Sequence, residues 1–313
     1  MSGRFEVTPW SRLVLSGGVR FERAADKTGG GGATFLPMLG ASWVERQGPV
    51  SLKLRGAHGR AVRWPQLVPL GGDGGGVSIW APALGPELQS GVEAGVDVGF
   101  GHSTSLHITR FDQTASGLLQ RVPFAPAADG VGLPPRERYG HRLEKVGEIS
   151  NRGWEVEGSW SRGPLALSGT LSLVDSRVRR LAEGYEGDLR AGDRMLGVPA
   201  LTTSLTAAWS RPAWSLALSG RRARDWTDYD RQALAEDVVA GSLVEDVVGE
   251  QLRAYWKGYP GVTHLGLTLT RQLHEGVTLT LAGDNLLNHQ LGEPDNLTVL
   301  PGRTLSLGVR ARF

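Results

Sequence analysis

Apolar and polar residues alternate along many stretches of this chain. In the last stretch, residues 304–313, every odd position is apolar and every even position holds Thr, Ser, Gly or Arg. Because successive side chains of a β-strand point to opposite faces, this pattern predicts a strand with one apolar and one polar face. The same division recurs in residues 165–173, 214–219, 264–270 and 277–282.

Over the whole chain, the alternation predicts thirteen strands whose connections are short and long in turn. The expected strands are residues 3–8, 11–23, 33–45, 49–58, 87–100, 103–122, 143–161, 164–177, 198–210, 213–224, 259–271, 276–288 and 302–313. Short turns lie at 8–11, 46–48, 101–102, 162–163, 211–212 and 272–275, and long loops at 24–32, 59–86, 123–142, 178–197, 225–258 and 289–301. Outer-membrane β-barrels have this arrangement, with short turns on one side and longer loops on the other.

The aromatic residues of the expected strands lie in two bands. Beside the short turns lie Trp10, Trp43, Phe100, Trp160, Trp209, Trp214 and Phe313, and at the opposite strand ends lie Phe21, Phe35, Trp154 and Tyr259. Aromatic rings favour the membrane–water interface. A soluble antiparallel sandwich also alternates, but it explains neither the bands nor the alternation of connections. We therefore expect an all-β protein, an antiparallel transmembrane β-barrel.

Composition and motifs exclude several other classes of protein. The net charge of +2 gives no electrostatic footprint for nucleic acid, and the absence of cysteine excludes disulfides and thiolate metal sites. No apolar stretch is long enough for a transmembrane helix, and the first ten residues lack the apolar core of a signal peptide. The motifs G-x-S-x-G, H-E-x-x-H and G-x-x-x-x-G-K-[ST] are absent. We expect no catalytic residue, metal or cofactor, and therefore no enzyme.

Several segments resemble a known family. The end of the chain combines Asn285 and Leu286 with Pro301, Gly302 and Arg303 before a final strand that closes on Phe313. Further matches are Arg20 to Glu22; Pro37, Ser42 and Trp43; Glu87, Gly91, Glu93 and Gly95; and Asn151, Gly153, Glu155 and Glu157, with a looser match at Val62, Arg63, Trp64 and Pro65. In order and spacing these segments resemble the barrel of TonB-dependent outer-membrane receptors.

The resemblance implies energised import of a scarce nutrient, such as a ferric siderophore or cobalamin, across the outer membrane. It also implies recognition of Phe313 by the barrel assembly machinery and coupling to the TonB complex through a plug domain. The family has a 22-stranded barrel. Because no plug, coupling box or signal peptide is visible, we expect residues 1–313 to be one barrel domain, the C-terminal part of such a barrel. A passive pore or structural barrel is the alternative.

Two sets of residues are candidates for functional contacts. Charges expected to face the lumen are Glu93, Asp97, Glu155, Glu157, Arg303 and Arg310, with the acidic residues paired to such arginines or to a plug. Candidates for a small chelate are Arg60, Arg63, Trp64, Trp80, Trp226 and Tyr229, because Arg binds carboxylates and aromatic rings stack on flat ligands. Asp225, Asp228 and Asp230 favour a solvated loop over a cation site, and residues 233–252 leave an ordered loop or a short amphipathic helix open.

Overall fold

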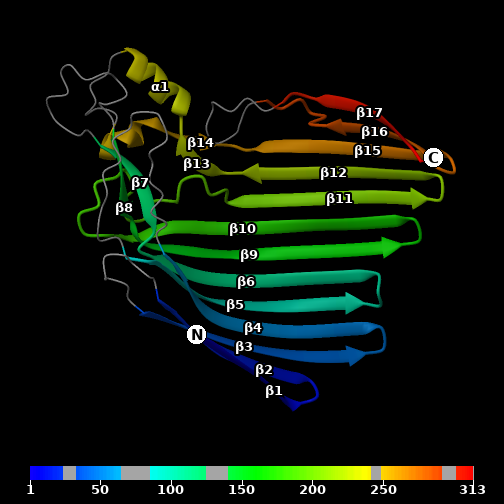
Figure 1. Ribbon diagram of the computed structural model, residues 1–313, viewed down its shortest axis with the longest axis horizontal. Coiled ribbons are helices and arrows are strands. Elements are labelled where there is room, and N and C mark those ends of the chain that lie inside the picture. Colours follow the sequence, from blue (N-terminus) through cyan, green and yellow to red (C-terminus); the bar gives the residue numbers. More distant parts are fainter. Residues whose placement is uncertain (24–32, 65–84, 125–139, 241–247, 291–300, 313) are drawn as a thin grey trace.

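A computed structural model describes residues 1–23, 33–64, 85–124, 140–240, 248–290 and 301–312. Thirteen strands form one antiparallel sheet in which each strand pairs with the next sheet strand along the chain (Figure 1). They are β1 (Ser2–Trp10), β2 (Leu13–Arg23), β3 (Ala33–Gln47), β4 (Val50–Arg63), β5 (Glu87–Phe100), β6 (Thr104–Ser116), β9 (Gly147–Arg162), β10 (Leu165–Leu181), β11 (Leu201–Arg211), β12 (Trp214–Arg224), β15 (Val262–His274), β16 (Val277–Asp284) and β17 (Thr304–Ala311). The thirteen predicted strands are thus confirmed.

The sheet is curved and open, as expected for part of a barrel (Figure 1). Strands β1 and β17 are its two edges and do not pair with each other within the described residues. The short turns gather at one end of the strands, and the long connections gather at the other (Figure 1). The first is called the turn end below, and the second the loop end.

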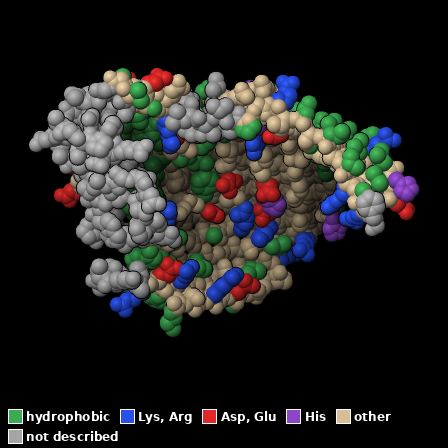
Figure 2. All heavy atoms as spheres, turned by 45° about the horizontal axis from the view of Figure 1, so that its top comes forward, with side chains coloured by type: hydrophobic (Ala, Val, Ile, Leu, Met, Phe, Trp, Pro, Cys, Tyr) green, Lys and Arg blue, Asp and Glu red, His purple; other side chains and the backbone are tan. Residues whose placement is uncertain are grey.

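The register divides the side chains between two faces. Leu218 of β12, for example, pairs with Ala207 of β11 and Leu267 of β15, whereas the next residue, Ser219, pairs with Thr206. Apolar residues therefore line up on the convex face, where Leu205 is 59% exposed. Charged side chains gather in the hollow of the concave face (Figure 2). A polar interior with an apolar exterior is the arrangement of a membrane barrel.

The loop end carries further secondary structure that the sequence pattern did not resolve. Two small hairpins stand apart from the main sheet: β7 (Leu119–Phe124) pairs with β8 (Gly140–Lys145), and β13 (Trp226–Tyr229) pairs with β14 (Trp256–Tyr259). An α-helix, α1 (Arg231–Ala240), and a 3-10 helix, η3 (Gly249–Tyr255), follow β13. A helix therefore forms at the start of residues 233–252. None of its described side chains is fully buried, and Val239 is 86% exposed.

Two predicted strands were too long. Residues 103–122 and 143–161 were each expected to be one strand, but both leave the main sheet at glycines with positive φ, Gly117 (φ 69°) and Gly147 (φ 123°). The Gly117 N–H donates to the Gly147 carbonyl at 2.8 Å, so the two breaks face each other. No helix among the described residues is long and apolar enough to span a membrane.

Candidate functional site

A charged network lies on the concave wall formed by β4, β5 and β6. Arg55 Nε lies 3.2 Å from Asp97 Oδ1, and His107 Nδ1 lies 3.1 Å from the same oxygen. The Arg55 guanidinium also donates to Thr109 Oγ1 at 2.5 Å. It crosses Gly95, where an added Cβ would lie 2.7 Å from Arg55 Cζ. Glycine at this position therefore lets the arginine reach across the strand to its partners.

All four acidic residues predicted to face the lumen meet in this region. Glu93, Asp97, Glu155 and Glu157 line one cavity of about 490 Å³, together with Arg55 and other residues of the wall. Glu93 accepts a hydrogen bond from Gln113 Nε2 at 3.1 Å. Within the described residues, Glu155 and Glu157 have neither a hydrogen bond nor an ion pair through their carboxylates. Of the four carboxylates, Asp97 therefore has a cationic partner, Glu93 has a neutral one, and Glu155 and Glu157 have none within the described residues.

The arginine that compensates Asp97 is Arg55, on the neighbouring strand, rather than Arg303 or Arg310. Arg310 does lie on the polar face of β17, where it pairs with Thr278, but β17 is the far edge of the sheet. Arg303 precedes β17, and its N–H donates to Asn288 Oδ1. Arg55 and His107 were not among the predicted lumen charges, although their alternation with Leu54 and Leu106 places both on the polar face.

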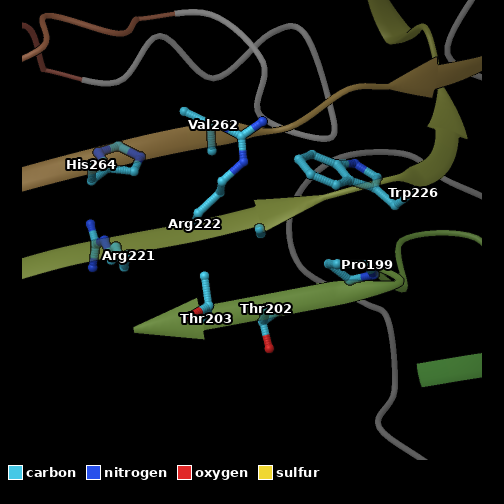
Figure 3. A pocket seen from close by; sticks show the side chains of 9 residues that line it. Pro199, Thr202, Thr203, Arg221, Arg222, Trp226, Val262 and His264 are labelled. Carbon is cyan, nitrogen blue, oxygen red and sulfur yellow. The ribbon is translucent and has the colours of Figure 1, made fainter. Parts of the chain in front are cut away.

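A second cavity of about 490 Å³ lies near the loop end of β11, β12 and β15 (Figure 3). Its lining includes Pro199, Thr202, Thr203, Arg221, Arg222, Ala223, Trp226, Val262 and His264. Trp226 is only 3% exposed and stacks on Tyr259, with ring centroids 5.6 Å apart. Its Nε1 is buried without a hydrogen-bond partner in the described part of the chain. The cavity thus combines cationic, hydroxyl and aromatic groups.

The loops at this end share a packed core of their own. Val146, Ile149, Val178 and Leu189 are buried together. The Asp188 carboxylate accepts hydrogen bonds from the Tyr229 hydroxyl at 2.6 Å and from Trp256 Nε1 at 2.7 Å. Burial, followed by the nearby charge of Asp188, raises the pKa of Tyr229 above its usual range. The Tyr229 hydroxyl therefore helps to hold the loop segments together through its hydrogen bond to Asp188.

An ion pair joins two of these loop segments. The Arg253 guanidinium bonds both carboxylate oxygens of Asp193 and also donates to the Asp188 carbonyl. Burial raises the pKa of Asp193, but the hydrogen bonds from Arg253 and from the Arg190 N–H outweigh it, so this pKa lies below its usual range. The hydrogen bond to Asp193 raises the pKa of Arg253. The pair is therefore ionised at neutral pH and ties the loops together.

Among the described residues, the predicted chelate contacts do not form one site. Arg60 and Arg63 lie at the loop end of β4, where Arg63 is 3.5 Å from Glu87, and Trp64 follows with a buried Nε1. Trp226 and Tyr229 lie on β13, which follows β12, many strands away in the sheet. Trp80 lies outside the described residues.

The acidic loop cluster forms no metal site in the part of the chain that the structure describes. Asp225 pairs with Arg224, and Asp230 pairs with Lys257. Asp228 accepts a hydrogen bond from the Tyr229 N–H. Each of the three carboxylates thus has a partner within the chain, and Asp228 lies on β13 rather than in a loop.

The aromatic residues near the turn end mostly share the apolar face. By their register, Trp43, Phe100, Trp160, Trp209 and Trp214 align with Leu13, Val50, Leu167, Leu165 and Arg271, respectively. Trp10 ends β1 beyond an irregularity in its pairing. Phe313 lies outside the described residues.

Solved structures with the same fold are transporters and receptors by name. The siderophore receptor PirA from Acinetobacter baumannii aligns with a TM-score of 0.68 at 11% identity, over 99% of this chain and 45% of that one. The FrpB iron transporter from Neisseria meningitidis (F5-1 variant) gives 0.66 at 18%, over 100% and 45%. The copper transporter OprC gives 0.65 at 15%, over 100% and 47%. The chain thus spans a little under half the length of these structures.

Curated protein sequences contain no match to this chain. Residues 3–286, however, match the family described as "TonB dependent receptor-like, beta-barrel". This match covers most of the chain and agrees with the open thirteen-stranded sheet. The chain therefore belongs to the TonB-dependent receptor β-barrel family.

Proposed function

We propose that this protein acts in the outer membrane as a receptor for uptake of a scarce nutrient, energised by TonB. The observation that carries the proposal is the family match over residues 3–286. The names of the solved structures point to iron, siderophores and copper as cargo of related folds. A ferric siderophore, cobalamin or a similar chelate is the cargo we propose, and catalysis is no part of this function.

The two faces of the sheet support a place in the membrane. The convex face exposes leucine and valine side chains that water would solvate poorly, whereas lipid accommodates them. Aromatic residues lie at its turn end, as an interfacial band would require. The barrel assembly machinery would act on the C-terminal Phe313, and TonB would act through a plug domain.

The loop-end cavity is the place where we propose the first contact with cargo. Arg221 supplies a guanidinium for a carboxylate or other anionic group, and Trp226 supplies an aromatic wall. His264 and Thr202 add polar groups to the same cavity. Arg60, Arg63 and Trp64, at the loop end of β4, are candidates for a separate contact.

Uptake in whole cells tests this proposal. A strain that lacks the gene is complemented with the intact protein and given radiolabelled ferric siderophores or cobalamin, with and without a protonophore. We expect accumulation that needs both the gene and the proton gradient. An Arg221→Ala variant should lower it, whereas Arg310→Ala, a concave-face arginine outside the cavity, should not. Gene-dependent entry that ignores the protonophore would instead identify a passive pore.

A further inference from the structure

The convex face changes from apolar to basic at its loop end. By the register, Arg110, Arg152, Arg177, Arg222 and Arg224 share this face with the leucine and valine side chains nearer the turns. These five residues are called the arginine band below. They lie on four of the central strands, β6, β9, β10 and β12.

The position of Arg222 along its strand is close to the edge of a membrane. On β12, Trp214 and Arg222 are eight residues apart on one face, which corresponds to about 26 Å of strand, or roughly 20 Å of height at a strand tilt of about 35–45°. Between them the same face carries Leu216 and Leu218. The apolar band of outer-membrane barrels is about 25 Å tall. Arg222 therefore lies near the loop-side edge of this band, from where its long side chain reaches the headgroups.

Three members of the band have a carboxylate partner, and two do not. Arg152 pairs with Asp112 at 3.0 Å, and Arg177 pairs with Asp175 at 2.8 Å. Arg224 pairs with Asp225 at 3.3 Å. These pairs leave little net charge, so the excess positive charge of the band belongs to its remaining two members.

Arg110 and Arg222 contact only neutral groups among the described residues. Arg110 lies over the Trp154 ring, 5.4 Å from its centroid, and donates to the Gly153 carbonyl at 3.0 Å. Arg222 borders the loop-end cavity, but its side chain extends towards β15 (Figure 3) and donates at 2.7 Å to Oγ1 of Thr263, its register partner on the convex face. Each guanidinium is held in place and keeps further N–H donors.

We propose that Arg110 and Arg222 bind the phosphate groups of anionic lipid headgroups in the leaflet on the loop side. A guanidinium matches two phosphate oxygens in a bidentate contact, and a charge at the edge of hydrocarbon gains from a counter-charge. The aromatic ring under Arg110 and the hydroxyl beside Arg222 orient the two donors outward. This inference rests on the membrane location in the proposed function.

Spin-labelled lipids test it in vesicles of phosphatidylcholine that contain the intact protein. The electron spin resonance spectrum reports how strongly phosphatidylglycerol, relative to phosphatidylcholine, associates with the protein surface. We expect the wild type to prefer phosphatidylglycerol and the Arg110→Gln/Arg222→Gln double variant to lose most of that preference. Each arginine near an anionic surface contributes about a fivefold effect locally. An Arg110→Lys/Arg222→Lys variant should keep part of it, because charge remains without the bidentate contact.

Arg221→Gln is the matched control for lipid preference, because Arg221 is adjacent to Arg222 on β12 but shares the concave face with His264. An unchanged preference in the double variant, or an equal loss in the Arg221→Gln control, would overturn the inference. Resistance of the strands to external protease shows separately whether the protein has inserted. Protein that inserts without any preference overturns this inference alone, whereas protein that never inserts overturns the proposed function with it.

Discussion

Replacing Leu218 by arginine tests which face of the sheet meets lipid. Leu218 is 46% exposed on the convex face, where it pairs with Ala207 and Leu267. Trp214 lies four residues away towards the turn end, and Arg222 lies four residues away towards the loop end. Each interval corresponds to about 13 Å of strand, or roughly 10 Å of height at a strand tilt of about 35–45°. Leu218 therefore lies close to the middle of an apolar layer about 25 Å tall.

The expected cost follows from this depth. An arginine facing lipid at the bilayer midplane destabilises a barrel by about 2–4 kcal/mol. Since about 1.4 kcal/mol is a factor of ten, Leu218→Arg should lower the folding equilibrium constant by roughly 30- to 900-fold. The adjacent Ser219 faces the concave side, so Ser219→Arg should cost little, because its guanidinium remains in a polar space.

The measurement is equilibrium unfolding in lipid vesicles, followed by tryptophan fluorescence during a urea titration of the intact protein. The two variants introduce the same side chain at consecutive positions, so strand propensity and total charge are matched. A large loss for Leu218→Arg and a small one for Ser219→Arg is the expected result. Equal losses, or a larger loss for Ser219→Arg, would refute the assignment of the apolar face to lipid.

Three further predictions concern the two ends of the strands and the loop core. Because the chain has no cysteine, an impermeant maleimide applied to intact cells should label Glu183→Cys, at the loop end, and not Arg162→Cys, beside a short turn; the reverse pattern would invert the topology. Acid should loosen the loops, because the pKa of Asp193 is lowered in the folded protein. The stability that ionised Asp193 gives the loops is complete above its unfolded pKa of about 4 and is lost as the pH falls through its folded pKa. Loop proteolysis should therefore rise in this pH range, and Asp193→Asn should make the rate of proteolysis less dependent on pH. Tyr229→Phe removes the hydroxyl that donates to buried Asp188 and should destabilise the loop core by about 1–3 kcal/mol, seen as faster amide exchange in residues 185–196; unchanged exchange would show that this bond is dispensable.

The strands of the sheet could be predicted because their signal is local. Alternation of period two assigns each residue to a face of the sheet without knowledge of its partners. The sequence alone therefore places Leu305 and Ser306 on opposite faces. Short turns such as that at Gly163, with its positive φ of 57°, then set which strands are neighbours. The thirteen strands and their antiparallel order follow from these two local rules.

The contacts of the candidate site depend on which residues lie side by side across the sheet. The alternation of apolar and polar residues along the chain carries no information about these neighbours. The lumen register placed Asp97 on the polar face, but its partner Arg55 is set by the pairing of β4 with β5. Trp226 was predicted as a ligand contact, and it lines the loop-end cavity, but its stacking on Tyr259, more than thirty residues along the chain, was not predicted. A sequence of loop residues does not reveal which rings pack together.

Gly117, which follows β6, and Gly147, which begins β9, show why a predicted strand can extend beyond the main sheet. Residues 143–161 were predicted as one strand, but a Cβ on Gly147 would lie 2.2 Å from the Arg180 carbonyl oxygen, so only glycine fits where this segment turns away from the main sheet. The turn brings Val146, which is fully buried, into the loop core beside Leu189. Residues that the predicted strands assign to the barrel wall therefore build part of the core that supports the loops.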